Sequence, residues 1–179
     1  MRRSVVFETH STTVDNERGV ATGWQPGELS ALGRAQAAEL GQRRRADGID
    51  LVLSSDLARA VETCRIAFAG TAIPVRADAR LRECDYGDLT GAPASVIEAE
   101  RPARVDAPFP GGQSYRQVTE CVRTLLDELH ADTGPHRVLV VGHTATRYSL
   151  EHLLTGRPLE TIVVGPFAWR PGWEWFTPV

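Results

Sequence analysis

The segment Arg137-Val138-Leu139-Val140-Val141-Gly142-His143 decides the fold class. Its apolar run is continuous rather than alternating, which is typical of a strand buried on both faces in a parallel sheet. Gly142 and His143 open a turn into a helical segment, and Gly156-Arg157-Pro158 supplies the glycine and proline that commonly follow a helix end. Residues 137 to 158 therefore predict a strand, a turn and a helix.

Two earlier stretches repeat this order of strand and helix. A repeated order of this kind is typical of an α/β domain with a mostly parallel sheet. The predicted elements are the strands Ser4–Phe7 and Asp50–Leu53, the helix Ala31–Leu40 behind the N-cap Ser30, and a helix from Leu57 to about Phe68 that Ser54-Ser55-Asp56 can cap.

Further elements complete the predicted order. They are a short edge strand at Ile73–Arg76, the longest helix with its apolar face from Val118 to Leu129, and a C-terminal antiparallel hairpin that joins 162–164, 167–169 and 173–176. Between Asp85 and Gly112 the regular pattern weakens. Since 179 residues is the length of one ordinary domain, we predict a single domain over residues 1–179.

Composition and charge narrow the function classes. The formal net charge of -3 gives no reason to expect a nucleic-acid partner, which would need a clustered basic surface. The run Arg43-Arg44-Arg45 is interpreted as the solvated end of a helix. No apolar run approaches the roughly 20 residues of a membrane span, and no signal-peptide pattern opens the chain. We expect a cytoplasmic protein with no membrane partner.

Chemistry-bearing side chains follow three of the predicted strands. His10 follows the first, Arg59 lies one turn into the helix after the second, and His143 follows the strand quoted above. Ligands of open α/β sheets bind beyond the carboxyl ends of the strands, so these groups should converge. A catalytic zinc normally needs three protein ligands, often at spacings such as H-E-x-x-H, which do not occur here. The other histidines are interpreted as structural: His130, His136 and His152.

Five motifs in this order resemble those of the histidine phosphatase superfamily, in the branch of cofactor-dependent phosphoglycerate mutases and small broad-specificity phosphatases. The motifs are Thr9-His10-Ser11-Thr12-Thr13-Val14-Asp15-Asn16, Leu29–Ala37, Ser54–Thr63, Leu81–Gly87 and Val140–His143. The resemblance spans nearly the whole chain. It implies a three-layer α/β/α sandwich of the phosphoglycerate mutase type, with a small cap supplied by Asp85 to Gly112.

The resemblance also implies a mechanism. His10 would attack phosphorus in line and form a phosphohistidine that water later hydrolyses. Glu83 would protonate the leaving oxygen, which requires a raised pKa at this carboxyl group. Arg59 and His143, with Asn16, would stabilise the charge on the transferring phosphoryl group. No metal ion and no cofactor takes part in this scheme.

Both neighbours of the nucleophile depart from the family motif. Thr9 stands where the family has arginine, and Ser11 stands where it has glycine. Loss of a charge-assisted phosphate contact costs about 1.5–3 kcal/mol of binding, so we expect another arginine to replace it. Arg147 is the first candidate because it lies one helical turn after His143. The weaker candidates are Arg82 and Arg18.

We predict a metal-independent phosphomonoesterase that acts on a small phosphorylated metabolite, with a homodimer as an open option. The alternatives are a catalytically weak or inactive phosphate-ligand-binding member of the fold, and a phosphoglycerate mutase-type phosphotransferase. The short cap favours a phosphatase over a mutase, which must hold its intermediate away from water. Further contacts to phosphate or substrate are expected from Thr9, Ser11, Thr22, Gly23 and Thr144, and Trp24 is expected to line the entrance or pack the loop.

Overall fold

The computed structural model describes residues 3–132, 134–165 and 170–177. A five-stranded sheet lies at its centre, with the strands in the order β3-β2-β4-β1-β5. The first four run parallel, and β5 pairs with β1 in the antiparallel direction. The elements are β1 Ser4–Thr9, α1 Val14–Glu17, α2 Ala31–Arg44, β2 Leu51–Ser55, α3 Ala58–Ala67, β3 Val75–Asp78, η1 Ala79–Leu81, η2 Gly87–Leu89, α4 Ala94–Glu100, η3 Arg101–Arg104, α5 Tyr115–Ala131, β4 Arg137–Gly142, α6 Thr144–Thr155, α7 Leu159–Val164 and β5 Trp173–Phe176.

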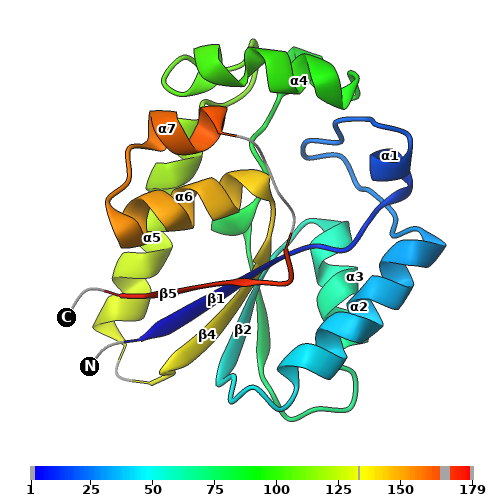
Figure 1. Ribbon diagram of the computed structural model, residues 1–179, viewed down its shortest axis with the longest axis vertical. Coiled ribbons are helices and arrows are strands. Elements are labelled where there is room, and N and C mark those ends of the chain that lie inside the picture. The colour runs from blue at the N-terminus through cyan, green and yellow to red at the C-terminus, as the bar shows by residue number, and fades with distance from the viewer. Residues whose placement is uncertain (1–2, 133, 166–169, 178–179) are drawn as a thin grey trace.

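Helices cover both faces of the sheet, as Figure 1 shows. Alternate residues of β1 point to opposite faces, so Phe7 joins a core with α5 and α6 while Val6 joins a core with α2 and α3. The strand β4 does the same with Val140 and Val141. This arrangement confirms the predicted three-layer α/β/α sandwich with a mostly parallel sheet.

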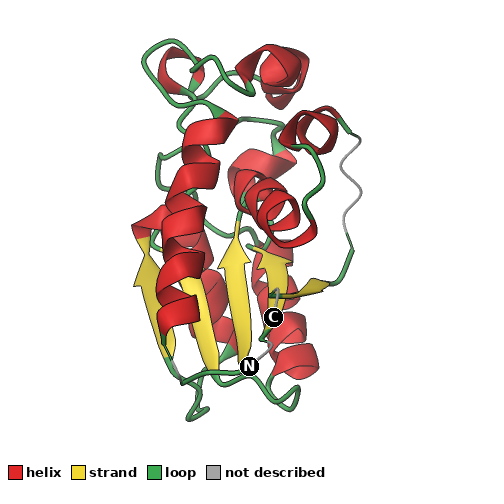
Figure 2. Cartoon of the chain, turned by 90° about the vertical axis from the view of Figure 1, so that its left-hand side faces the viewer, coloured by secondary structure: helices red, strands yellow, loops and turns green. Residues whose placement is uncertain are grey.

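A small cap stands over the carboxyl ends of the strands. It consists of η2, α4 and η3, which follow one another between β3 and α5 (Figure 2). Ile97 of α4 and Phe109 pack on Tyr115 and Tyr148 of the helices below. The segment in which the sequence pattern weakens is therefore the cap, and its apolar side chains attach it to α5 and α6.

The predicted C-terminal hairpin is wrong in its first arm. Residues 162–164 belong to the helix α7, because Leu159, Ile162 and Val163 fall at helical spacing and bury one face in the core beneath the cap. Residues 167–169 lie outside the described residues. The second arm is a strand, β5, which pairs with β1. The predicted edge strand at 73–76 begins two residues later, at Val75.

The interpretation of Arg43-Arg44-Arg45 as a solvated helix end is confirmed only in part, because Arg43 and Arg45 are exposed at the end of α2 but the side chains of the run also bind neighbouring elements. The carboxylate of Glu8, a buried residue of β1, accepts a hydrogen bond from Arg44 Nε at 2.9 Å and lies 3.4 Å from Arg43 Nη2. The guanidinium group of Arg45 donates to the carbonyl oxygen of Ala67 at 2.6 Å. The basic run therefore joins the end of α2 to β1 and α3. Among the described residues, no helix has the length and apolar character needed to span a bilayer.

Candidate active site

His10 lies directly after β1, where hydrogen bonds fix both its backbone and its ring. Its backbone N–H donates to the carbonyl oxygen of Gly142 at 2.9 Å, which continues the pairing of β1 with β4. The ring nitrogen Nδ1 lies 2.8 Å from the carbonyl oxygen of Ser11. Because a carbonyl oxygen can only accept, Nδ1 carries the proton and Nε2 keeps its lone pair. This is the tautomer that a nucleophilic imidazole needs.

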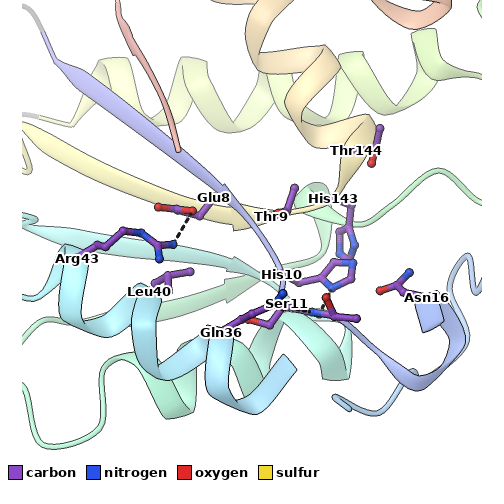
Figure 3. Close-up of a pocket in the computed structure, with 11 residues that line it drawn as sticks. Glu8, Thr9, His10, Ser11, Asn16, Gln36, Leu40, Arg43, His143 and Thr144 are labelled. Atoms are coloured by element: carbon purple, nitrogen blue, oxygen red, sulfur yellow. Dashed lines mark hydrogen bonds and ion pairs between the residues drawn. The ribbon is translucent and has the colours of Figure 1, made fainter. Parts of the chain in front are cut away.

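His143 faces His10 from the N-terminus of α6. The two ring centroids are 4.9 Å apart, and the His143 side chain is almost fully buried. An Arg59 N–H group lies 3.3 Å from His143 Nδ1, so this nitrogen accepts and the proton belongs on Nε2. Within the part of the chain that the structure describes, Nε2 has no hydrogen-bond partner. His143 therefore offers one free donor beside the nucleophile (Figure 3).

Arg59 reaches the two histidines from the first turn of α3. Its side chain is buried, and its two terminal nitrogens donate to the carbonyl oxygens of Gly23 at 2.8 Å and Gln25 at 3.1 Å. Thr63, one turn further along α3, accepts from the backbone N–H of Ser11 at 3.0 Å. The first turns of α3 thus hold both the guanidinium group and the loop that follows the nucleophile.

Glu83 lies below the cap, and backbone groups hold its carboxyl group. Oε1 accepts from the N–H groups of Cys84 at 2.8 Å and Ala145 at 3.2 Å, and Oε2 accepts from Thr144 N–H at 3.2 Å. The N-terminus of α6 therefore positions the carboxyl group next to His143. Trp24 adds a support from the opposite side, because its indole N–H donates to the backbone carbonyl oxygen of Glu83 at 2.6 Å.

The surroundings of the site lower the pKa of His10 and raise the pKa of Glu83. Burial and then the nearby charge of Arg59 lower the pKa of His10 to about 3, against the opposing effect of the Ser11 carbonyl group. Burial is also the main reason why the pKa of His143 falls well below its usual value. Burial raises the pKa of Glu83, although Cys84 N–H, Arg59 and the α6 backbone act against it. The site therefore combines neutral imidazoles with a carboxyl group that binds a proton more readily than an exposed glutamate does.

Two cavities meet at His10. We name the first the cap cavity; it has a volume of about 270 Å³, and its lining includes Arg59, Glu83, Tyr86, Arg101 and Tyr115. We name the second the α2 cavity; it has a volume of about 390 Å³, and its lining includes Thr9, Ser11, Gln36, Leu40 and Arg43. Both cavities are also lined by His10, Asn16 and Thr144.

The structure brings most of the predicted site residues to these two cavities. Asn16 holds its side-chain oxygen in the cap of α1, where it accepts from Thr13 N–H at 3.0 Å, so its amide nitrogen remains as a donor for a ligand. Thr22 and Gly23 line the cap cavity, and Thr9 and Ser11 line the α2 cavity. Trp24 lies in neither lining, and its ring packs under Arg82 with the guanidinium carbon 4.8 Å from the ring centroid.

The expectation that Arg147 replaces the missing arginine is wrong. Its guanidinium group lies 2.6 Å from Glu151 and over the rings of Tyr148 and Trp173, in a cavity that His10 does not line. The one-turn spacing from His143 carries the side chain toward β5 rather than toward the phosphate position. The weaker candidate Arg82 pairs with Asp56 at 2.6 Å, and Arg18 is exposed outside both linings.

Several residues of the site were not found in the sequence. Arg101 comes from the cap, and one of its N–H groups donates to the Tyr148 hydroxyl group at 2.6 Å while the side chain lines the cap cavity. Gln36 accepts from Thr12 N–H at 3.0 Å and lines the α2 cavity with Arg43. The weak pattern between 85 and 112 concealed Arg101. The buried Glu8, an acid inside an apolar strand, was the one available signal for Arg43.

Comparisons with known proteins show which family this chain belongs to. Residues 6–165 match the profile of the family described as the histidine phosphatase superfamily (branch 1). A 2,3-bisphosphoglycerate-dependent phosphoglycerate mutase of Methylobacterium sp. (strain 4-46) is 31% identical, over 100% of this chain and 89% of its own length. Among solved structures, mycobacterial hydrolase 1 aligns with a TM-score of 0.81 at 28% identity, over 90% of this chain and 85% of that protein. A mycobacterial glucosyl-3-phosphoglycerate phosphatase aligns with a TM-score of 0.77 at 31% identity, over 89% and 85%.

Proposed function

Since the chain belongs to the histidine phosphatase superfamily (branch 1), we propose that it is a phosphomonoesterase that works through a phosphohistidine at His10. The observation that carries the proposal is the pairing of two neutral imidazoles 4.9 Å apart beside Arg59 and a carboxyl group of raised pKa. A nucleophile, charge-stabilising donors and a general acid are the groups that this reaction needs.

In the proposed first step, His10 Nε2 attacks phosphorus while the bond to the leaving oxygen breaks. Glu83 gives its proton to that oxygen, and Arg59 and His143 Nε2 donate hydrogen bonds to the phosphoryl oxygens. In the second step, water attacks phosphorus while the bond to His10 Nε2 breaks, Glu83, now a carboxylate, takes a proton from that water, and phosphate is released. Each residue acts at the place where its hydrogen bonds hold it, so the scheme needs no metal ion and no cofactor.

The cap cavity would hold the organic part of the substrate. In-line attack puts the leaving oxygen opposite His10, and Glu83 must lie beside that oxygen to protonate it. Glu83 lines the cap cavity together with Tyr86, Tyr115 and Arg101. Aromatic rings and one guanidinium group suit a small metabolite with an acidic or hydroxylated part. The substrate class we propose is therefore a small phosphorylated metabolite.

The direct test is hydrolysis of p-nitrophenyl phosphate in the presence of EDTA. We expect activity that EDTA does not reduce and that His10→Ala abolishes. His130→Ala is the matched control, since His130 is an exposed histidine on α5 outside both cavities. No hydrolysis of this compound, nor of any member of a panel of sugar phosphates and phosphorylated acids, would favour a phosphate-binding protein without turnover.

A second candidate function is phosphoglycerate mutase-type phosphotransfer, which the 31% identical relative favours by its name. A mutase must return the phosphoryl group from His10 to the substrate before water reaches it. The cap here contains only the seven-residue helix α4 and short 3-10 turns, which favours the phosphatase. Interconversion of 2- and 3-phosphoglycerate faster than phosphate release, in the presence of 2,3-bisphosphoglycerate, would reverse this choice.

A further inference from the structure

The α2 cavity contains His10 and His143 at one end, but the part of it that extends from them toward α2 is not used in the reaction proposed above. It opens from His10 toward α2, away from the cap, with Ser11 and Gln36 near the nucleophile and the Glu8–Arg43 pair at its far end (Figure 3). Its volume of about 390 Å³ exceeds the 270 Å³ of the cap cavity and falls in the range of ligand pockets. A cavity of this size next to the nucleophile has room for part of a substrate.

Thr9 explains why there is room beside His10. Its short side chain stands where the family motif has arginine, and it lines the α2 cavity. An arginine side chain at this position would fill part of the cavity and would bring a guanidinium group to one oxygen of a phosphate held by His10. Thr9 leaves this oxygen with space around it and without that positive charge.

The geometry of in-line transfer decides what can enter this space. The leaving oxygen must lie opposite His10 and next to Glu83, and Glu83 lines the cap cavity but not the α2 cavity. A group in the α2 cavity that is bonded to the same phosphorus must therefore be attached through another oxygen. A phosphorus atom with organic groups on two oxygens is a phosphodiester.

The positive charge available around His10 also favours a phosphodiester as the substrate. A phosphomonoester carries close to two negative charges above its second pKa of about 6, whereas a phosphodiester carries one. The guanidinium group in contact with His143 is that of Arg59, while His10 and His143 are neutral. Arg101 and Arg43 also line the two cavities, but they bind the Tyr148 hydroxyl group and Glu8. A site that has exchanged one arginine for threonine suits a phosphorus centre that has lost one charge.

We propose that this protein also hydrolyses phosphodiesters, with the leaving group in the cap cavity and the retained substituent in the α2 cavity. The proposal rests on the phosphohistidine mechanism stated above. His10 Nε2 forms a bond to phosphorus while the bond to the leaving oxygen breaks, and Glu83 protonates that oxygen to release an alcohol. Water then attacks phosphorus, the bond to His10 breaks, and Glu83 takes the proton. The sum is diester plus water to monoester plus alcohol.

The lining of the α2 cavity indicates which substituent would be retained. Ser11 and Gln36 offer a hydroxyl group and an amide nitrogen near His10, and Leu40 contributes an apolar wall. Gln36 and Arg43 are seven residues apart on α2, or about 10 Å along the helix axis. At the far end Glu8 is shared between Arg44 at 2.9 Å and Arg43 at 3.4 Å, so it offsets only part of their positive charge. These features suit a polar, hydroxylated group of the size of glycerol or a sugar.

The test compares p-nitrophenyl phosphate with two diesters, methyl p-nitrophenyl phosphate and glyceryl p-nitrophenyl phosphate, in EDTA. We expect the wild-type protein to release p-nitrophenolate from all three compounds and to form methyl or glyceryl phosphate as the first product of the diesters, before any further hydrolysis to inorganic phosphate. Thr9→Arg fills the part of the α2 cavity next to His10 and restores the charge, so diester kcat/KM should fall about tenfold or more while monoester kcat/KM rises. Thr9→Val keeps the volume and should keep the preference of the wild-type protein. Thr9→Lys is a second charged variant in case Thr9→Arg does not fold.

The possible outcomes separate this inference from the proposed function. Hydrolysis of the monoester alone, or an unchanged ratio of diester to monoester activity in folded Thr9→Arg or Thr9→Lys, would overturn the diesterase and leave the phosphomonoesterase intact. Hydrolysis of neither class would overturn both. Diester hydrolysis that persists in His10→Ala would show that the activity does not use this site.

Discussion

At the scale of single residues, the two facing histidines are chemically different because different partners fix their tautomers. The Ser11 carbonyl group keeps the proton of His10 on Nδ1, whereas the Arg59 guanidinium group keeps the proton of His143 on Nε2. One imidazole therefore presents a lone pair and the other presents a donor. A phosphoryl group between them would be attacked by the first and held by the second.

Glu83→Gln should affect substrates according to their leaving groups. An alkoxide leaving group needs a proton, so the rate for alkyl phosphates should fall by about 10²–10⁴, whereas p-nitrophenolate leaves without a proton and its rate should fall far less. The rate of the first turnover, measured by rapid quench for glycerol phosphate and for p-nitrophenyl phosphate, isolates this step from the later hydrolysis of the phosphohistidine, in which Glu83 also acts. The wild-type rate for the alkyl substrate should also decline as pH rises through the raised pKa of Glu83, because the acid form is lost. Equal losses for both substrates would exclude a general-acid role for Glu83.

At the scale of helices and strands, the sequence predicts elements best where local pattern and tertiary packing agree. The strands before His10 and His143 were predicted because their apolar runs are continuous, and Ser30 was identified as an N-cap that the structure confirms through Gly33 N–H. The β-branched residues at 162–164 misled the prediction, because the burial of Ile162 and Val163 under the cap is a tertiary effect. The position of Arg147 could not be foreseen, since a one-turn spacing fixes a helix face but not the neighbour of that face.

Gly41→Ala should destabilise the protein although alanine favours a helix. A Cβ atom on Gly41 of α2 would lie 2.3 Å from the carbonyl oxygen of Ala67 at the end of α3, so the two helices would have to separate. We expect a loss of about 1–3 kcal/mol in the free energy of unfolding, against a propensity gain of about 1 kcal/mol. Urea denaturation of the variant measures this. Gln42→Ala, at the exposed neighbouring position, should be nearly neutral, and a stabilised Gly41→Ala would refute the close contact.

At the scale of the whole molecule, the cost of burying the site should appear in the pH dependence of stability. The pKa of His10 is about 3 in the folded protein and about 6.5 when unfolded, and the pKa of His143 is shifted in the same direction. At pH values between the folded and unfolded pKa, these imidazoles are protonated in the unfolded chain but neutral in the folded protein. The free energy of unfolding therefore decreases as pH falls below about 6.5. Glu83 has the opposite effect. Because its pKa is raised in the folded protein, the free energy of unfolding decreases as pH rises and Glu83 loses its proton.

A variant with both His10→Asn and His143→Asn should therefore lose less stability than the wild-type protein between pH 7.5 and pH 5.5. Chemical denaturation at the two pH values gives the comparison, and this window lies above the ordinary range of the carboxyl groups. His130→Ala with His152→Ala serves as the control for the mere loss of two histidines. The same pH dependence in the wild type and the double variant would mean that the two imidazoles titrate alike in the folded and unfolded states.

Both proposed activities require a covalent phosphohistidine at His10. The most direct measurement mixes the protein with excess p-nitrophenyl phosphate, stops the reaction within milliseconds in alkali, where phosphohistidine survives, and maps the phosphorylated peptide by mass spectrometry. We expect one phosphoryl group on His10, formed as fast as the first p-nitrophenolate is released and absent from His10→Ala. Steady turnover with no phosphorylated protein at any time, or with the phosphoryl group on a different residue, would contradict it.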